Sequence, residues 1–335
     1  MRRIAVAALV VIGLLVAVGA GLALWLVRSF DEPDPLAQAA TIVIPRGAGV
    51  DDIARLLADA KVITDPLVFR LGVRISSAAP RLRAGEYAFP AAASPRDIME
   101  QIIAGKVVVR RLTIPEGLTT KAILQLVANA EAMTGSVTRT VGEGELMPDT
   151  YHYVYGDSRD GLVARMQKAM RDTLDTLWAQ RTADTHVASP QQALVLASVV
   201  EGETGVADER ALVAGVFVNR LKRGMKLQSD ITVAYGVAKR EGRANDVLNR
   251  PLSREDLTTP GPYNSYVNDG LPPTPINNPG RSAIAAAIKP APTDALYFVA
   301  DGTGGHTFSR TLEEHNRAVA KLRQIERARR GAGSP

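Results

Sequence analysis

Two glutamates, Glu201 and Glu203, lie where the sequence could turn a carboxyl group into a general acid. The segment from Gln191 to Thr204 is apolar on every helical side, a pattern that predicts a buried helix. Both glutamates come at its C-terminal end, where burial and the negative end of the helix dipole raise the pKa of a carboxyl group. A carboxylic acid that is still protonated near neutral pH is what a general acid requires.

The spacing of Glu201 and Glu203 argues against a facing pair of carboxylates. Residues two apart on a helix point in nearly opposite directions, whereas the two carboxyls of a retaining glycosidase lie about 5 to 5.5 Å apart across the bond. We therefore expect one glutamate to face a cleft and the other to cap the helix end or pair with a base. The alternative interpretation is two solvated charges at a helix end.

The helix that must position these glutamates has recognisable ends. Ser189 is a suitable N-cap and Pro190 suits the first turn, so the helix is predicted to begin there. Gly202 and Gly205 are suitable places for it to stop. An amphipathic helix is predicted before it, over residues 161–181.

Loops that follow Leu227 are dense in polar and aromatic residues. Amides, hydroxyls and tyrosine rings can hydrogen-bond sugar hydroxyls and stack on the C–H faces of pyranose rings, so the loops favour a sugar-binding cleft. Ordinary structured loops are the alternative, since Pro, Gly and Asn also mark turns. The loops concerned contain residues 228–230, 263–266, 270–276 and 278–280.

Several other chemistries lack the residues that they need. Cysteine is absent, which excludes disulfides, thiolate metal sites and a cysteine nucleophile. The four histidines show no zinc-binding spacing, so we expect no metal and no cofactor. Neither Gly-x-Ser-x-Gly nor Ser-x-x-Lys occurs, which leaves acid–base catalysis by a carboxyl group.

The N-terminus predicts a membrane anchor. The run from Ile4 to Val27 has no charged residue and is long enough to cross a bilayer as a helix. Arg2 and Arg3 precede it, so the positive-inside rule keeps the N-terminus in the cytoplasm. A cleaved signal peptide is the alternative. We expect an uncleaved single-pass anchor over residues 1–30, followed by a linker over residues 31–40.

An internal repeat marks the region from residue 41 to residue 132. Ile44-Pro-Arg-Gly47 and Ile114-Pro-Glu-Gly117 each open a segment with apolar residues at the same offsets. Each copy predicts a short strand (residues 41–44 and 107–114), a Pro-Gly turn and an amphipathic helix. The region therefore predicts one or two small α+β modules, the first of which resembles the LysM-like module of cell-wall proteins.

The composition of the chain limits the number of domains and the kinds of partner that can be expected. The 335 residues suffice for two or three domains, and 46% hydrophobic with 22% charged residues is typical of a globular chain. The formal net charge is only +5, from 40 basic and 35 acidic residues. Without a basic patch interleaved with aromatic residues, we expect no nucleic-acid partner.

Collinear blocks of sequence carry a resemblance to a known family. They are Glu143-Gly-Glu-Leu-Met-Pro-Asp-Thr-Tyr151, Leu196-Ala-Ser-Val-Val-Glu-Gly-Glu-Thr204, Asn219-Arg-Leu221, Leu227-Gln-Ser-Asp230, Pro262-Tyr-Asn-Ser-Tyr266, Gly270-Leu-Pro-Pro273, Tyr297-Phe-Val-Ala-Asp-Gly302 and His306-Thr-Phe308. Together they resemble the YceG-like endolytic murein transglycosylases (MltG family) over essentially the whole chain after the anchor.

The resemblance, combined with the patterns above, implies an α+β protein. An N-terminal transmembrane helix and small LysM-like α+β modules are expected to precede a mainly helical, lysozyme-like catalytic domain with cleft loops. That domain is expected over residues 133–330, with a tail over residues 331–335.

The activity implied is that of a membrane-anchored lytic transglycosylase, a carbon–oxygen lyase acting on peptidoglycan glycan strands. Such enzymes cleave the β-1,4 bond from N-acetylmuramic acid to N-acetylglucosamine and leave a 1,6-anhydro end. A single carboxyl acts first as acid and then as base. The partners implied are glycan strands, cell-wall synthases (penicillin-binding proteins) and the bacterial inner membrane, with the catalytic part outside the cytoplasm.

The resemblance also implies site residues. The family's catalytic glutamate is the one followed by a hydroxyl residue, which is Glu203, with Glu201 as the alternative. Two departures are visible: Ile231 stands where the family usually has proline, and Met147 replaces a usual phenylalanine. The substrate-binding residues implied are Thr204, Gln228, Asp230, Tyr263, Asn264 and Tyr266.

Two other functions compete with this one. A non-catalytic, membrane-tethered scaffold that binds peptidoglycan would make both glutamates structural. A hydrolytic muramidase would need a positioned water and usually a second carboxylate, for which Asp230 is the candidate.

Overall fold

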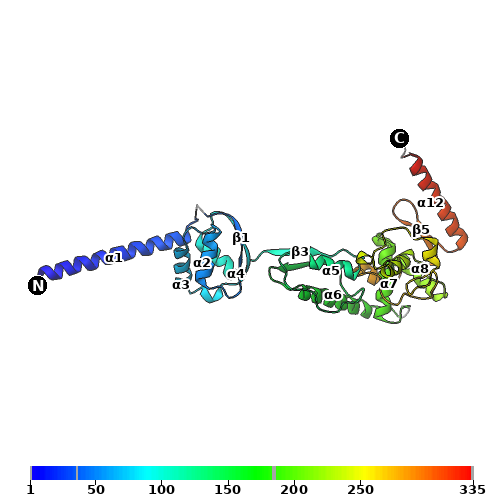
Figure 1. Ribbon diagram of the computed structural model, residues 1–335, viewed down its shortest axis with the longest axis horizontal. Coiled ribbons are helices and arrows are strands. Elements are labelled where there is room, and N and C mark those ends of the chain that lie inside the picture. The colour runs from blue at the N-terminus through cyan, green and yellow to red at the C-terminus, as the bar shows by residue number, and fades with distance from the viewer. Residues whose placement is uncertain (1, 35–36, 183–185, 333–335) are drawn as a thin grey trace. The chain divides into compact units, whose positions relative to one another are not determined.

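The computed structural model describes residues 2–34, 37–182 and 186–332, which form two compact units (Figure 1). The first unit holds the chain up to Arg111 together with His152–Asp157. The second holds Leu112–Tyr151 and the chain from Ser158 onward. The sequence placed this boundary after residue 132. The structure divides the chain earlier because helix α5 (Thr120–Ala128) packs against α6 (Arg159–Ala179) within the second unit.

A two-stranded sheet and three short helices build the core of the first unit. Strand β1 (Ala40–Ile44) pairs antiparallel with β2 (Gly85–Phe89), so that Ala40 lies opposite Phe89 and Ile44 opposite Gly85. The helices bury their apolar faces in one cluster that includes Leu57, Phe69, Tyr87 and Ile98. They are α2 (Val50–Asp59), α3 (Pro66–Ile75) and α4 (Pro95–Ala104), and a 3-10 turn lies at Ala79–Arg81.

Helix α1 (Arg2–Asp31) contains the predicted anchor. Among the described residues it is the one helix long and apolar enough to cross a membrane, and its most apolar stretch is not buried in the protein. Its last turn is buried at Phe30, whose ring lies so close to Gly72 that a methyl group there would overlap it. Arg96 lies 5.2 Å from the Phe30 ring centroid and holds Asp31 by a 2.7 Å ion pair.

The segment predicted as a linker, residues 31–40, packs onto the first unit. Asp34 accepts hydrogen bonds from the backbone N–H (2.8 Å) and the hydroxyl (2.7 Å) of Thr64. Ala37 is buried, and its carbonyl accepts from the N–H of Ala92. A polar, proline-rich composition therefore did not distinguish a free linker from a segment with specific partners. Residues 35 and 36 lie outside the described residues.

Both copies of the predicted repeat form a strand, a turn and a helix. The first copy is β1 followed by α2, and the second is β3 (Val109–Thr113) followed by α5. Each turn has its glycine in the left-handed region, with φ 83° at Gly47 and 79° at Gly117. Strand β3 pairs with β4 (Thr150–Val154).

The predicted buried helix is the centre of the second unit. Helix α7 (Pro190–Glu203) is buried throughout residues 193–200, and Ser189 caps it by accepting from the N–H of Gln192 at 3.2 Å. Because it is apolar on every side, it can be enclosed by helices on all sides. The enclosing helices are α6, α8 (Arg210–Lys222), α9 (Asp230–Arg240) and α11 (Arg281–Ile288).

Smaller elements complete the second unit. Strands β5 (Tyr297–Ala300) and β6 (His306–Ser309) form an antiparallel hairpin against which α12 (Leu312–Ala332) packs. Helix α12 includes the first two residues of the predicted tail, and residues 333–335 lie outside the described residues. Helix α10 (Arg254–Thr258) and 3-10 turns at Ala207–Glu209 and Ala244–Asp246 lie in the connecting loops. The described residues thus confirm a mixed α+β protein.

Candidate active site

Glu201 and Glu203 at the end of α7 have different surroundings. The Glu201 side chain is only 5% exposed and forms an ion pair with Arg210, with 3.2 Å between Oε1 and Nη2. Its other oxygen accepts from the backbone N–H of Gly280 at 2.9 Å. Glu203 instead lines an open pocket of about 340 Å³. The expectation that one glutamate pairs with a base while the other faces a cleft therefore matches the geometry.

Five parts of the second unit supply the walls of this pocket, called here the Glu203 pocket. These five are joined by the loop that carries Tyr266: the parts are the end of α7, helix α8, the α8–α9 loop with the first residue of α9, strand β5 and the start of α12. Its volume lies at the small end of the usual range for ligand sites, about 300–1,000 Å³. The lining side chains are Glu203, Phe217, Arg220, Leu227, Gln228, Asp230, Tyr266, Tyr297, Phe298, Leu312 and His315.

The surroundings of Glu203 favour its protonated form. Burial is the main cause that raises the pKa of Glu203 above its usual value, and the nearby charge of Asp230 acts in the same direction. A hydrogen bond from the Ser229 hydroxyl opposes this rise, as do His306 and Arg220. A carboxyl group with a raised pKa beside a pocket is suited to donate a proton.

A network of hydroxyl groups holds Ser229 against Glu203. The Ser229 hydroxyl donates to Glu203 Oε1 at 2.5 Å, and the Ser229 backbone N–H donates to Ser265 Oγ at 2.9 Å. Ser265 Oγ also lies 2.7 Å from Thr232 Oγ1. These side chains are buried, so the short loop before α9 has a fixed position beside the carboxyl group.

Three of the six predicted substrate-binding residues line the Glu203 pocket: Gln228, Asp230 and Tyr266. The Tyr266 hydroxyl donates to Asp230 Oδ1 at 2.6 Å. Burial and this bond both raise the pKa of Tyr266, which keeps its phenol protonated. Gln228 adopts a left-handed backbone conformation (φ 50°), and its side-chain oxygen accepts from Arg220 Nη1 at 3.3 Å.

Thr204 and Tyr263 do not line this pocket. Thr204 is buried, and its hydroxyl oxygen accepts from the backbone N–H of Val206 at 3.0 Å, which closes the turn after α7. The Tyr263 ring packs edge-on against Tyr235 at 4.9 Å, and its hydroxyl lies 2.8 Å from Thr274 Oγ1. Thr204 thus stabilises a turn and Tyr263 packs in the protein interior, so neither side chain is placed to contact a ligand in the Glu203 pocket.

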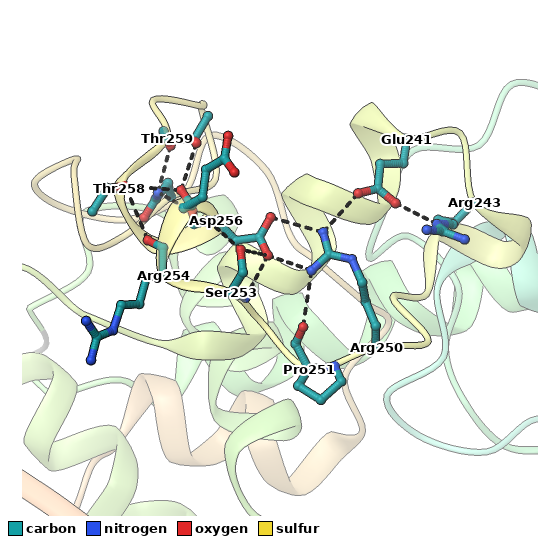
Figure 2. Close-up of polar contacts among 11 residues, drawn as sticks. Glu241, Arg243, Arg250, Pro251, Ser253, Arg254, Asp256, Thr258 and Thr259 are labelled. Atoms are coloured by element: carbon teal, nitrogen blue, oxygen red, sulfur yellow. Dashed lines mark hydrogen bonds and ion pairs between the residues drawn. The ribbon is translucent and has the colours of Figure 1, made fainter.

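Asn264 also lies outside the pocket, in the base of the loop that carries Tyr266. Its buried side-chain amide donates to the carbonyls of Asp256 (3.1 Å), Leu257 (3.1 Å) and Thr259 (2.8 Å). Figure 2 shows the ion pairs of Asp256, one of the residues that Asn264 contacts: Arg250 reaches both oxygens of Asp256 (2.6 and 3.1 Å) and also Glu241 (3.0 Å). Asn264 therefore shapes the loop without facing the pocket.

Three residues of the pocket wall were not among the predicted site residues: Arg220, Tyr297 and His315. For Arg220 a signal was available: it continues the stripe of Val213, Val216 and Phe217 on α8, so helical periodicity turns its side chain inward. An arginine at an inward position is a candidate functional residue. No comparable local signal marks Tyr297 or His315.

Within residues 2–34, 37–182 and 186–332, no group of three or more His, Cys, Asp or Glu side chains could hold a metal ion. His306, on β6, instead pairs with Glu209, with 2.6 Å between Nδ1 and Oε2.

The sequence model of the YceG-like family matches residues 42–321. A protein of Streptococcus pneumoniae named endolytic murein transglycosylase is 30% identical over 327 residues, covering 84% of this chain and 58% of the relative. A protein of the same name from Bacillus subtilis is 37% identical over 180 residues, covering 53% of this chain and 47% of the relative. The chain thus spans about half the length of the curated relatives that it matches.

The chain is also similar to solved structures. A crystal structure of a YceG-like protein from Listeria monocytogenes is 31% identical, covers 84% of this chain and 99% of that chain, and superposes with a TM-score of 0.49.

Proposed function

This chain belongs to the YceG-like family, and on that premise we propose that it is an endolytic lytic transglycosylase of peptidoglycan. The observation that carries the proposal is the contrast between the two glutamates of α7. Glu201 is held by Arg210, whereas Glu203 lines a pocket, has a raised pKa and accepts a hydrogen bond from a neutral hydroxyl group. A proton on Glu203 is therefore available to a bound substrate.

The reaction that suits a single acid is an intramolecular displacement. Glu203 gives its proton to the oxygen of the β-1,4 bond between N-acetylmuramic acid and N-acetylglucosamine, and the bond from that oxygen to C1 breaks. The resulting carboxylate takes the proton from the muramyl 6-hydroxyl, whose oxygen forms the new bond to C1. Glu203 ends protonated as it began, no water is consumed, and the new end is a 1,6-anhydro ring.

The remaining pocket side chains suit a sugar. Asp230, held by Tyr266, and the amide of Gln228 can hydrogen-bond ring hydroxyls or N-acetyl groups. Phe298 and Leu312 offer apolar surface on which the C–H face of a pyranose can pack.

We further propose that α1 anchors the enzyme in the cytoplasmic membrane, with the catalytic unit outside the cytoplasm. The support is its length, its apolar composition and the arginines that precede the apolar run. The order β1-α2-α3-β2 in the first unit supports a LysM-like module, and the second unit is proposed as the lysozyme-like catalytic part. Cell-wall synthases (penicillin-binding proteins) are proposed partners, because new glycan strands are made at the same membrane face.

Mass spectrometry of digested glycan strands tests the reaction. The full chain in detergent is expected to release products with anhydro-muramic ends, each one water lighter than a hydrolysis product. Glu203→Gln is expected to lower the rate about 10²–10⁴-fold, the usual contribution of a general acid. Glu201→Gln is the matched control: it loses the ion pair to Arg210 and should lose stability, yet give the same products.

Hydrolysis is the second candidate, because Asp230 places another carboxylate in the Glu203 pocket. A muramidase would use Asp230 to orient a water or to stabilise the sugar cation, and its products would carry ordinary reducing ends. Strand binding with no cleavage by the wild-type chain would instead favour the non-catalytic scaffold.

A further inference from the structure

Arg220 is a buried positive charge with no carboxylate partner among the described residues. Its side chain belongs to α8, the residue is only 8% exposed, and it lines the Glu203 pocket. Burying a charge is costly unless an opposite charge or enough hydrogen bonds compensate it. Other buried charges of this chain follow that rule, since Glu86 pairs with Arg110, Glu201 with Arg210 and Asp256 with Arg250.

The hydrogen bonds of Arg220 fix its guanidinium group but leave one end unused. Nε donates to the carbonyl of Leu296 at 2.7 Å, and Nη1 donates to the carbonyl of Leu227 at 2.9 Å. Nη1 also reaches the carbonyl of Lys226 (3.2 Å) and the side chain of Gln228 (3.3 Å). Nη2 has no acceptor within the part of the chain that the structure describes. Neutral acceptors thus orient the group without cancelling its charge.

The neighbours of Arg220 do not cancel its charge either. The Tyr297 ring lies 5.1 Å from the guanidinium carbon, and His315 stacks on that ring at 5.3 Å. Burial and the charge of Arg220 lower the pKa of His315, so its ring is neutral near pH 7. Of the two carboxyl groups that line the pocket, Glu203 is held toward its protonated form, whereas Asp230 is bonded by Tyr266 and forms no ion pair with Arg220 in the described structure. The pocket therefore has a pre-oriented cation in need of an anion.

We propose that Arg220 binds a carboxylate carried by the glycan substrate, through its free Nη2 edge. Because Nε and Nη1 are already used, Nη2 can give a carboxylate oxygen a charge-assisted hydrogen bond, and the charge of the guanidinium group adds to the attraction. This inference rests on the proposed function, in which the substrate is a glycan strand. Such a strand can carry a carboxylate in two places: on the lactyl ether of muramic acid, where the stem peptide has been removed, or on a stem peptide. Arg220 would then select strands by their charge and align the muramyl residue with Glu203.

The proposed carboxylate binding can be tested on the full wild-type chain with substrates that differ only in whether their carboxyl groups are free. Two pairs of substrates are compared. In the first pair, peptide-free strands have lactyl carboxyls that are either free or converted to primary amides. In the second pair, peptide-bearing strands have peptide carboxyls that are either free or amidated. The rate of anhydro-end formation at low substrate concentration gives kcat/KM for each. We expect about a tenfold or greater loss on amidation in one pair, from loss of a charged hydrogen bond. The pair that responds identifies the source of the carboxylate.

Two variants show whether Arg220 is the receptor. Arg220→Gln should cleave acid and amide strands of the responsive pair at equal rates. Arg220→Lys should keep part of the preference, since it keeps the charge but loses the guanidinium group that the backbone carbonyls orient. Arg250→Gln, which changes a paired arginine outside the pocket, should keep the wild-type preference. Thermal unfolding of each variant shows whether that variant folds. The comparison of acid and amide strands with the wild-type chain does not depend on any variant.

The outcomes separate this inference from the function on which it rests. Equal wild-type rates within both pairs would overturn the role of Arg220 while leaving the transglycosylase intact. A preference that persists in folded Arg220→Gln would also overturn it. If Arg220 acted only on Glu203, the variant would shift the pH profile and slow acid and amide strands equally. No anhydro ends from any strand would overturn the proposed function, and this inference with it.

Discussion

Ser229 donates its hydroxyl hydrogen to Glu203 Oε1 across 2.5 Å, and this bond joins the end of α7 to the start of α9. The two residues are 26 apart in sequence. Ser229 precedes α9, but its side chain does not cap that helix, and within the described structure its hydroxyl donates to Glu203 alone. Its hydrogen bond favours the charged form of Glu203 and limits how far burial raises the pKa.

Replacing Ser229 by alanine should change the pH dependence of cleavage. Without the hydroxyl, the carboxylate of Glu203 loses a donor, so the pKa of Glu203 rises further. The alkaline limb of kcat/KM, which reports loss of the acid's proton in the free enzyme, should move to higher pH. Thr204→Ala is the control, because the Thr204 hydroxyl binds Val206 and should leave the limb in place. An unmoved limb in Ser229→Ala would show that Glu203 is not the titrating acid.

Glu203→Gln should be more stable than the wild type at neutral and alkaline pH. Because the folded-state pKa of Glu203 lies above its ordinary value of 4.5, the folded protein holds a proton that the unfolded chain has lost. Wild-type stability therefore falls as pH rises through the interval between the two values. Glutamine carries no charge and escapes this loss. Thermal unfolding across pH should show an advantage of the variant that shrinks toward pH 4.5, and a variant less stable at every pH would contradict the raised pKa.

The central helix could be predicted from the sequence because its signals are local. The apolar pattern of residues 193–200, the cap at Ser189 and the proline at position 190 all lie within the segment that they describe. The separate surroundings of Glu201 and Glu203 could not be predicted. They depend on Arg210, Gly280 and Ser229, which reach the end of α7 from three other segments.

The cleft loops show a second limit of prediction from sequence. Their composition indicated polar and aromatic side chains near a site, and Gln228, Asp230 and Tyr266 do line the Glu203 pocket. Composition does not reveal which side a loop residue faces, however. Asn264 turns away because three backbone carbonyls at the end of α10 accept hydrogen bonds from its amide, and these contacts form only once the loop has folded back onto that helix.

The Arg250–Asp256 pair should stabilise the second unit only above strongly acidic pH. The guanidinium of Arg250 and the Ser253 bonds lower the pKa of Asp256 below its ordinary value of 3.8. The stability that they contribute is complete above the ordinary value and is lost as pH falls through the folded value. Asp256→Asn should cost about 1–2 kcal/mol at neutral pH, since Arg250 is partly exposed.

Thermal unfolding of Asp256→Asn against pH measures this effect. The deficit should be constant above 3.8 and shrink on acidification below it. Glu255→Gln, next to it on α10, removes a carboxyl that has no ion pair among the described residues and should cost little. If the stability deficit of Asp256→Asn did not change with pH, the lower stability would come from the altered hydrogen bonds of the amide and not from the lost charge.

The contact between Gly202 on α7 and Ile231 on α9 sets the distance between these two helices. A β-carbon at residue 202 would lie 2.4 Å from Ile231 Cδ1 and 3.6 Å from its Cγ1, so one terminal methyl group causes the clash. Gly202→Ala should cost about 1–3 kcal/mol, the usual effect of an added methyl in a packed site. It should also slow cleavage, because Ser229 lies two residues before Ile231 and would move away from Glu203.

Ile231→Val removes the clashing methyl group and little else, which makes a double-mutant cycle informative. Alone it should cost about 0.5–1 kcal/mol, because Ile231 is partly buried. In that background Gly202→Ala should be neutral or stabilise by up to about 1 kcal/mol, since alanine favours a helix over glycine. The coupling energy from chemical denaturation, and recovery of the cleavage rate in the double variant, measure the contact. If the two costs simply add, the α7–α9 approach is not set by this pair, and the position of Ser229 must depend on Ser265 and Thr232 alone.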